Sequence, residues 1–175
     1  VDLNNIAHRT PFSTGAELEN IMNEAALLAA RGGLKEISQN LLIEAVEKSQ
    51  MGPAKKSHKV LEEDRKLVAF HEAGHAVTAY YLPLCDDVHK VTIIPRGGAG
   101  GYTLSLPERE LDNLSREALK QKISMALGGH AAERLIFNDI YTSAQGDLKQ
   151  AMRIGRAMVT QYGMSTELGT QVFGQ

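Results

Sequence analysis

The 175 residues suffice for one domain of ordinary size or two small ones, and 43% hydrophobic with 23% charged residues is typical of a soluble globular protein. The formal net charge of −2, with no basic run longer than Lys55-Lys56, argues against a nucleic-acid partner. Cys85 stands alone, which excludes an intrachain disulfide and favours a reducing compartment. No apolar run approaches the ~18 residues of a membrane span and no signal-peptide pattern is present, so we expect this stretch to be soluble.

Residues 1–50 are predicted to be all-helical. Asp2, Thr14 and Ser38 can each cap a helix, ending at about residues 9, 31 and 48, and Thr14 with Glu17 forms a capping box. The second helix carries an apolar stripe that neighbouring helices must cover: Leu18, Ile21, Met22, Ala25, Leu28 and Ala29. Residues 51–59 contain a Gly-Pro turn and lack periodicity, which predicts a linker.

The next helix carries an H-E-x-x-H pentad at 71–75. The run from Arg65 to Leu82 carries apolar residues at helical spacing, and Glu62, Glu63 and Asp64 before it place acids where a helix N-terminus favours them. Because side chains four apart share one helix face, His71 and His75 can direct two imidazoles at one metal ion. Glu72 can reach a water on that metal, an arrangement typical of zinc hydrolases. The alternative is two surface histidines on an ordinary helix, since such a pentad also arises by chance.

The remaining chain alternates strand and helix signals. A β-branched run predicts a strand over 88–95, and a second strand is expected at 102–106. The glycines at 97–101 lack the order of a phosphate loop and lead into a strand, which indicates a hairpin-type connection. Ser115 can cap a long helix to about residue 137, where Gly128-Gly129 would allow close helix packing. A last helix is predicted over 145–162.

The third ligand of such a site is open on the residues alone. A catalytic zinc takes three protein ligands and keeps one open position. The candidates are His89, Glu108, His130, Glu133, Asp139 and Asp147. Asp147 is attractive because it opens a helix, but acids in a first helical turn are common as partners of the helix dipole.

The order of motifs along nearly the whole chain resembles the FtsH family, the membrane-anchored, ATP-dependent zinc proteases. The peptidase-like stretches are residues 67–75, 101–103, 106–108, 128–133, 147–148 and 162–165. Residues 1–50, with S-T-G-A-E-L at 13–18 and N-E-A-A-L-L-A-A-R at 23–31, resemble the helical lid of that family's AAA module. Met51-Gly52-Pro53 resembles its linker.

This resemblance implies a zinc metalloendopeptidase that degrades unfolded or membrane proteins. It implies His71, His75 and Asp147 as zinc ligands and Glu72 as the catalytic carboxylate that activates water together with zinc. It also implies that Gly146 stands where the family usually has Asn, so that the loop at the site is looser.

The implied fold is mainly α. A helical AAA lid over residues 1–50 and a linker over 51–59 precede a mostly helical zinc-peptidase domain with a small β element over 60–175, which would continue beyond the chain. Gly15 and Ala16 are implied to lie against the adenine nucleotide. The chain has no Walker A loop and no strand-borne acidic pair for magnesium, so ATP and magnesium would act only in the full-length protein.

The resemblance also implies partners of the full-length protein, and two alternatives to the peptidase function stay open. The full-length protein is expected to be a homo-hexamer or related hetero-oligomer, anchored in the bacterial inner membrane facing the cytoplasm or in an organelle membrane. A non-catalytic assembly or regulatory subunit is the first alternative, and the intact pentad and Asp147 argue against it. A fragment with an incomplete site is the second. His130, where the family usually has Arg, removes no ligand.

Overall fold

The computed structural model describes residues 1–55, 60–106 and 113–173. In this part of the chain the helices are α1 (Leu3–Arg9), α2 (Gly15–Arg31), α3 (Gln39–Met51), α4 (Glu62–Tyr81), α5 (Arg116–Phe137) and α6 (Gln145–Thr160), with a short 3₁₀ turn, η1 (Thr142–Ala144), before α6. The strands β1 (Asp87–Thr92) and β2 (Tyr102–Leu106) form a two-stranded sheet. The expectation of a mainly helical fold with a small β element is confirmed.

The described residues fall into two compact units. The first holds residues 1–55, 94–100 and 106, and the second holds 60–93, 101–105 and 113–173. None of the helices in these ranges is both long and apolar enough to cross a bilayer. The linker expected at 51–59 lies partly outside the described residues, and its extent stays a prediction.

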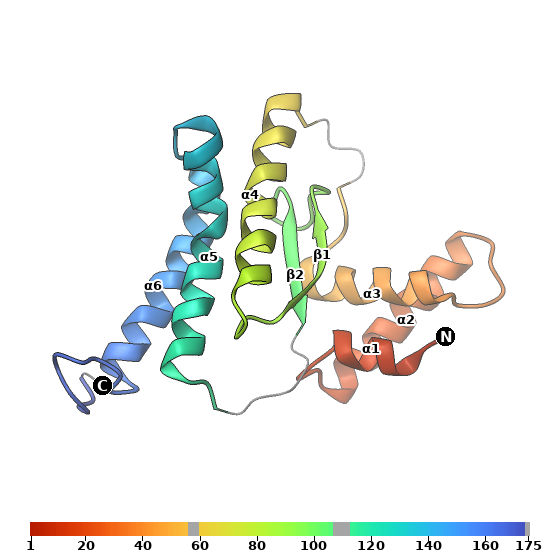
Figure 1. The fold of residues 1–175 in the computed structure, drawn as a ribbon. Helices are drawn as coiled ribbons and strands as arrows, with labels where there is room; N and C mark the ends of the chain where they lie inside the picture. Colours follow the sequence, from red (N-terminus) through yellow and green to blue (C-terminus); the bar gives the residue numbers. More distant parts are fainter. Residues whose placement is uncertain (56–59, 107–112, 174–175) are drawn as a thin grey trace. The chain divides into compact units, whose positions relative to one another are not determined.

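The first unit is made of α1, α2 and α3 (Figure 1). The side chains of Asp2, Thr14 and Ser38 each accept a hydrogen bond from the third backbone N–H of their helix, and Glu17 completes the capping box at Thr14. All three predicted caps are therefore present. The buried core consists of Ile6, Ile21, Ala25, Leu42, Ala45 and Val46. Of the predicted stripe on α2, Ile21, Ala25 and Ala29 are buried, whereas Leu18 and Met22 are exposed.

Residues 94–100 attach to the end of α3 within this first unit. The backbone N–H groups of Arg96 and Ala99 each donate to the carbonyl of the other, at 3.2 and 2.9 Å, which reverses the chain as the hairpin prediction requires. The buried Arg96 guanidinium forms an ion pair with the buried Glu47 carboxylate at 2.8 Å and donates to the Gly52 carbonyl at 3.3 Å. The strands on either side of this turn belong to the second unit, except for Leu106 at the end of β2.

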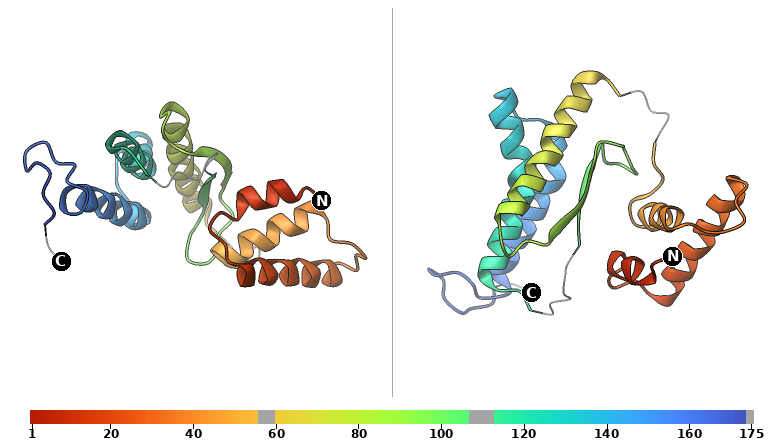
Figure 2. Two further views of the ribbon diagram at one scale, coloured as in Figure 1. Left: turned by 90° about the horizontal axis from the view of Figure 1, so that it is seen from below. Right: turned by 45° about the vertical axis from the view of Figure 1, so that its right-hand side comes forward.

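The second unit places α4 between α5 and the two strands, with α6 on the far side of α5, as Figures 1 and 2 both show. The observed α4 begins at Glu62, and Glu62, Glu63 and Asp64 form its acidic first turn, as the acids before Arg65 predict. The observed β1 ends at Thr92, short of the predicted end at Pro95. Ser115 caps α5 as predicted.

Two glycines bring α4 and α5 together. A Cβ atom on Gly74 would lie 2.3 Å from the Gly128 carbonyl oxygen, and one on Gly128 would lie 2.6 Å from the Gly74 carbonyl oxygen. The two backbones therefore touch where α4 carries the pentad. This close approach, expected from the glycines themselves, sets the pentad face of α4 against α5.

Candidate metal centre

Three side chains from two helices meet at one point in the second unit. His71 and His75 lie one turn apart on α4, and Asp147 lies in the first turn of α6. The Nε2 atoms of His71 and His75 are 3.1 Å apart, and the Asp147 Oδ2 atom lies 3.1 Å from the first and 3.4 Å from the second. Among the described residues this is the one group of three or more metal-ligating side chains that the geometry gathers.

The hydrogen bonds of the two histidines orient their lone pairs. The Nδ1 atom of His75 lies 2.8 Å from the Met125 carbonyl oxygen, which can only accept, so Nδ1 carries the proton. The Nδ1 atom of His71 lies 2.7 Å from Oε1 of Glu133 and donates to that carboxylate. In the neutral rings both Nε2 atoms are therefore unprotonated and face each other and the Asp147 carboxylate.

This donor set fits a zinc ion. With zinc–ligand distances of about 2.0–2.1 Å in a tetrahedral site, ligand atoms lie about 3.3 Å apart, close to the three separations found here. Three electron-rich atoms at such distances repel one another unless a cation or protons lie between them. Two imidazoles and one carboxylate also leave one position open, as a catalytic site requires.

The titration of these groups supports the same conclusion. Burial lowers the pKa of His71 and of His75. Hydrogen bonds to Asp147 and Glu133 outweigh burial at His71, and hydrogen bonds to Asp147 and the Met125 carbonyl outweigh it at His75. The pKa of each histidine is therefore raised. Burial raises the pKa of Asp147, but the two histidines hold it well below its usual range. When no metal is bound, the cluster therefore favours protonated histidines, which place positive charge between the three ligand atoms.

Gly129 on α5 makes room for the cluster. A Cβ atom there would lie 2.6 Å from Nε2 of His71 and 2.7 Å from Nε2 of His75. Any larger residue would occupy the space where the three ligand atoms converge. The sequence marks this glycine as a point of close packing, but not as a neighbour of the metal ligands.

The other candidate ligands lie elsewhere. His89 on β1 and Asp139 after α5 are exposed and outside the cluster. His130 on α5 has a buried Nδ1 atom with no hydrogen-bond partner in the described ranges. Glu108 falls outside the described residues. Glu133 is fully buried and contacts the Nδ1 side of His71, opposite the Nε2 atom that faces the cluster.

Glu72 is buried beside these histidines, with 6% of its surface exposed. Its Oε2 atom and its own carbonyl oxygen both face the hydroxyl of Thr103 on β2, at 2.8 and 3.1 Å. Burial raises the pKa of Glu72, and the Thr103 hydrogen bond and the charges of His75 and His71 partly offset that rise. The sequence did not predict the contact of Thr103 with Glu72. The alternation of side chains along β2 indicates which face of the strand carries Thr103, but not which residue it contacts.

The remaining predicted positions are exposed. Gly15 and Ala16 form the exposed first turn of α2, directly after the Thr14 cap, and no atom lies within 4 Å of a Cβ placed on Gly15. Gly146 is likewise exposed with nothing within 4 Å of such a Cβ. Their roles in nucleotide binding and in the site loop stay predictions.

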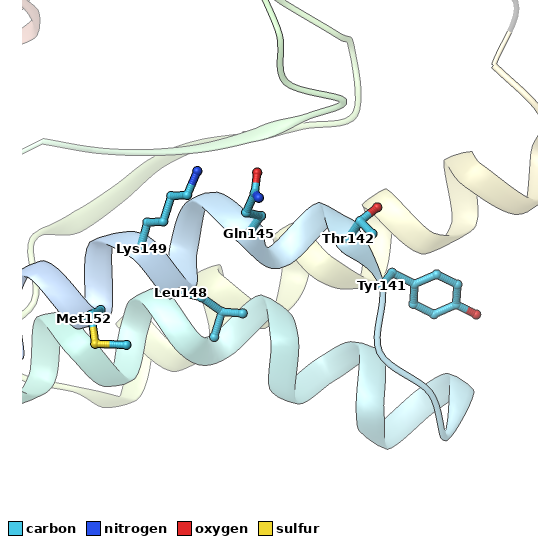
Figure 3. A pocket seen from close by; sticks show the side chains of 6 residues that line it. All are labelled: Tyr141, Thr142, Gln145, Leu148, Lys149 and Met152. Atoms are coloured by element: carbon cyan, nitrogen blue, oxygen red, sulfur yellow. The ribbon is translucent and has the colours of Figure 1, made fainter.

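A surface pocket of about 390 Å³ lies over one face of the first turns of α6 (Figure 3). Its lining consists of Tyr141, Thr142, Gln145, Leu148, Lys149 and Met152. None of these side chains is a carboxylate, imidazole or thiol, the groups that make up the cluster. The candidate site is therefore the cluster around Asp147, which is not among the pocket's lining residues.

Residues 58–175 match peptidase family M41, and residues 1–44 match the AAA+ lid domain. The chain belongs to peptidase family M41. It is 55% identical over 174 residues to "ATP-dependent zinc metalloprotease FtsH 1" of Thermoanaerobacter sp. (strain X514), which covers 99% of the chain and 28% of that relative. It is 54% identical over 175 residues to "ATP-dependent zinc metalloprotease FtsH" of Veillonella parvula, covering 100% of the chain and 27% of the relative.

The M41 match confirms the resemblance to FtsH and shows that residues 58–175 are of a metalloprotease family. The lid match confirms a helical AAA lid before it. The chain spans a little over a quarter of the length of the curated relatives it matches.

Proposed function

We propose that this chain supplies the peptidase site and the AAA lid of an ATP-dependent zinc metalloendopeptidase, with His71, His75 and Asp147 as zinc ligands and Glu72 as catalytic carboxylate. The observation that carries the proposal is the convergence of two Nε2 lone pairs and one carboxylate oxygen within 3.4 Å of one another. The relatives' names, which specify a zinc metalloprotease, support the choice of metal.

Zinc supplies Lewis acidity, because a catalytic zinc lowers the pKa of its water to about 7 and polarises a carbonyl oxygen. Asp147 lowers the charge of the site, and Glu133 and the Met125 carbonyl hold the imidazoles in place. Glu72 accepts a proton from the attacking water and returns it to the leaving amine as the peptide bond breaks. Its burial, which raises the pKa of Glu72, suits a group that must both take and release a proton.

The strand β2 offers a place for the substrate chain. In the described ranges the sheet has two strands, so β2 is an edge strand. An extended peptide can add to such an edge by main-chain hydrogen bonds, and Thr103 on this strand contacts Glu72. A substrate bound along β2 would therefore lie beside the catalytic carboxylate. An unfolded segment can readily adopt this extended form.

Coupling to ATP belongs to the same proposal. The match of residues 1–44 to the AAA+ lid and the relatives' description as ATP-dependent support it. Gly15 and Ala16 at the exposed start of α2 would contact the nucleotide. Magnesium, the ATP-hydrolysing residues, a hexameric ring and a membrane anchor would come from the full-length protein, with unfolded or membrane proteins as substrates.

Metal analysis tests the site. Mass spectrometry of the purified protein should find about one zinc per chain, lost in both His75→Phe and Asp147→Ala. Glu72→Gln should retain zinc and lose hydrolysis of an unfolded substrate such as casein by at least about 100-fold. Zinc retained in Asp147→Ala would move the third ligand elsewhere, and full activity in Glu72→Gln would overturn the choice of base. No zinc in the unaltered protein, even after reconstitution, would support an incomplete or non-catalytic site.

A further inference from the structure

We propose that Thr103 is a positioning residue that holds one oxygen of Glu72 and leaves the other to take the proton of the attacking water. This inference rests on the proposed role of Glu72. The Thr103 hydroxyl lies 2.8 Å from Oε2 of Glu72 and 3.1 Å from the carbonyl oxygen of the same residue. No hydrogen bond to Oε1 of Glu72 is found within the described ranges.

Gly101 brings Thr103 into this position. A Cβ atom on Gly101 would lie 2.7 Å from Cγ1 of Val68 and 3.2 Å from Cγ of Glu72, both on α4, and 2.6 Å from the Thr92 carbonyl oxygen. The chain therefore enters β2 in direct contact with α4. Because side chains alternate along a strand, Thr103, two residues later, points toward the same face. The threonine is thus held against Glu72 by the backbone, not by its own rotamer alone.

The contact constrains a side chain that would otherwise have several positions. A glutamate has three side-chain torsions, and leaving a buried carboxylate oxygen without a hydrogen-bond donor is unfavourable. The Thr103 hydroxyl can donate one proton, and the two acceptors that it faces both belong to Glu72. It therefore ties the Glu72 carboxylate to the backbone of the pentad. With Oε2 engaged, Oε1 is the oxygen available to a water at the metal centre.

Ser105 provides a matched control. It lies two residues further along β2, on the same side of the strand by alternation. Its hydroxyl is also buried, but it has no hydrogen-bond partner in the described ranges. A Ser105→Ala variant therefore removes a buried hydroxyl from the same strand face without removing a contact to Glu72.

The experiment compares Thr103→Val, Thr103→Ser and Ser105→Ala in the purified, zinc-loaded protein. We expect all three to keep about one zinc per chain. Thr103→Val, which keeps the shape and loses the donor, should lower kcat on casein by about tenfold or more with KM unchanged. Thr103→Ser should restore kcat to within about threefold, and Ser105→Ala, which removes no contact to Glu72, should keep the kcat of the unaltered protein.

A crystal structure of zinc-loaded Thr103→Val gives a readout independent of activity. The Glu72 carboxylate should occupy a different rotamer there and its original one in Thr103→Ser. Unchanged kcat, or an unmoved Glu72 carboxylate in Thr103→Val, would overturn the positioning role. If the unaltered protein binds zinc but hydrolyses nothing, the proposed function fails, and the position of the carboxylate alone decides the role of Thr103.

Discussion

The carboxylate of Glu133 lies 2.7 Å from Nδ1 of His71, and it is fully buried. The same carboxylate accepts hydrogen bonds from the Ser143 hydroxyl at 2.6 Å and from the Tyr141 backbone N–H at 3.1 Å. One side chain of α5 therefore connects a proposed ligand on α4 with the segment that leads into α6. Since α6 carries Asp147, Glu133 helps to place ligands on both helices.

Glu133→Gln should weaken zinc binding by about 10- to 100-fold, because partners of this kind orient the ligand imidazole. All three neighbours of Glu133 donate hydrogen bonds, so an amide NH₂ at either oxygen position would face another donor. Competition titration with a chelator measures the affinity. Glu117→Gln, on the exposed first turn of α5, is the control and should leave the affinity unchanged.

A second substitution separates this role from simple loss of folding. Ser143→Ala removes one donor to Glu133 but leaves the contact to His71 in place. It should lower zinc affinity less than Glu133→Gln does. Equal zinc affinity in Glu133→Gln and the unaltered protein would show that the His71 ring is oriented by other contacts.

Zinc affinity should fall as the pH is lowered. The pKa values of His71 and His75 are raised above the ordinary value of 6.5, with the Asp147 hydrogen bond opposing the effect of burial. Below these raised values both rings are protonated, and zinc must displace the protons. With two protons released, the affinity should fall by up to about 100-fold per pH unit well below both pKa values.

Isothermal titration at several pH values checks the number of protons released. His89→Gln is the matched control, because His89 is exposed and lies outside the cluster. This variant should show the same pH dependence as the unaltered protein. Affinity that is constant from pH 8 to pH 5 would mean that the histidines are not ligands.

Gly128→Ala should destabilise the second unit by about 1–3 kcal/mol, the usual cost of overpacking. The added methyl group would lie 2.6 Å from both the Gly74 carbonyl oxygen and the Thr78 hydroxyl, so α4 and α5 must separate. Gly155→Ala on α6 is the control, since its Cβ would meet only Cδ1 of Ile123 at 3.9 Å. That variant should gain roughly 0.5–1 kcal/mol in helix propensity. Urea unfolding measures both, and equal stability of the two variants would contradict the close contact.

Gly146→Asn should be tolerated at the site. The position is exposed in the first turn of α6 and a Cβ there meets no atom within 4 Å. Asparagine also has a slightly better helix propensity than glycine, by a few tenths of a kcal/mol. We expect zinc affinity within about threefold of the unaltered protein and equal or higher thermal stability. A large change in zinc affinity would show that this position contacts the zinc-loaded site.

Features that depend on neighbours within about four residues follow from the local order of residues. The caps at Asp2, Thr14, Ser38 and Ser115 are local hydrogen bonds between a side chain and a backbone three residues away, so the residue order is enough to predict them. The pairing of His71 with His75 is equally local, because a helix places residues four apart on one face.

Without the family resemblance, which implied Asp147, the residues alone could not select the distant side chains that join the two histidines. The sequence offered six candidates for a third ligand, and the packing of α4, α5 and α6 brought Asp147 to the cluster across 76 residues and Glu133 to the far side of His71 across 62. The contact between Thr103 and Glu72 depends on the glycine that lets β2 touch α4. Such contacts follow from how helices and strands pack, and no periodicity in the chain encodes the distance between residues so far apart.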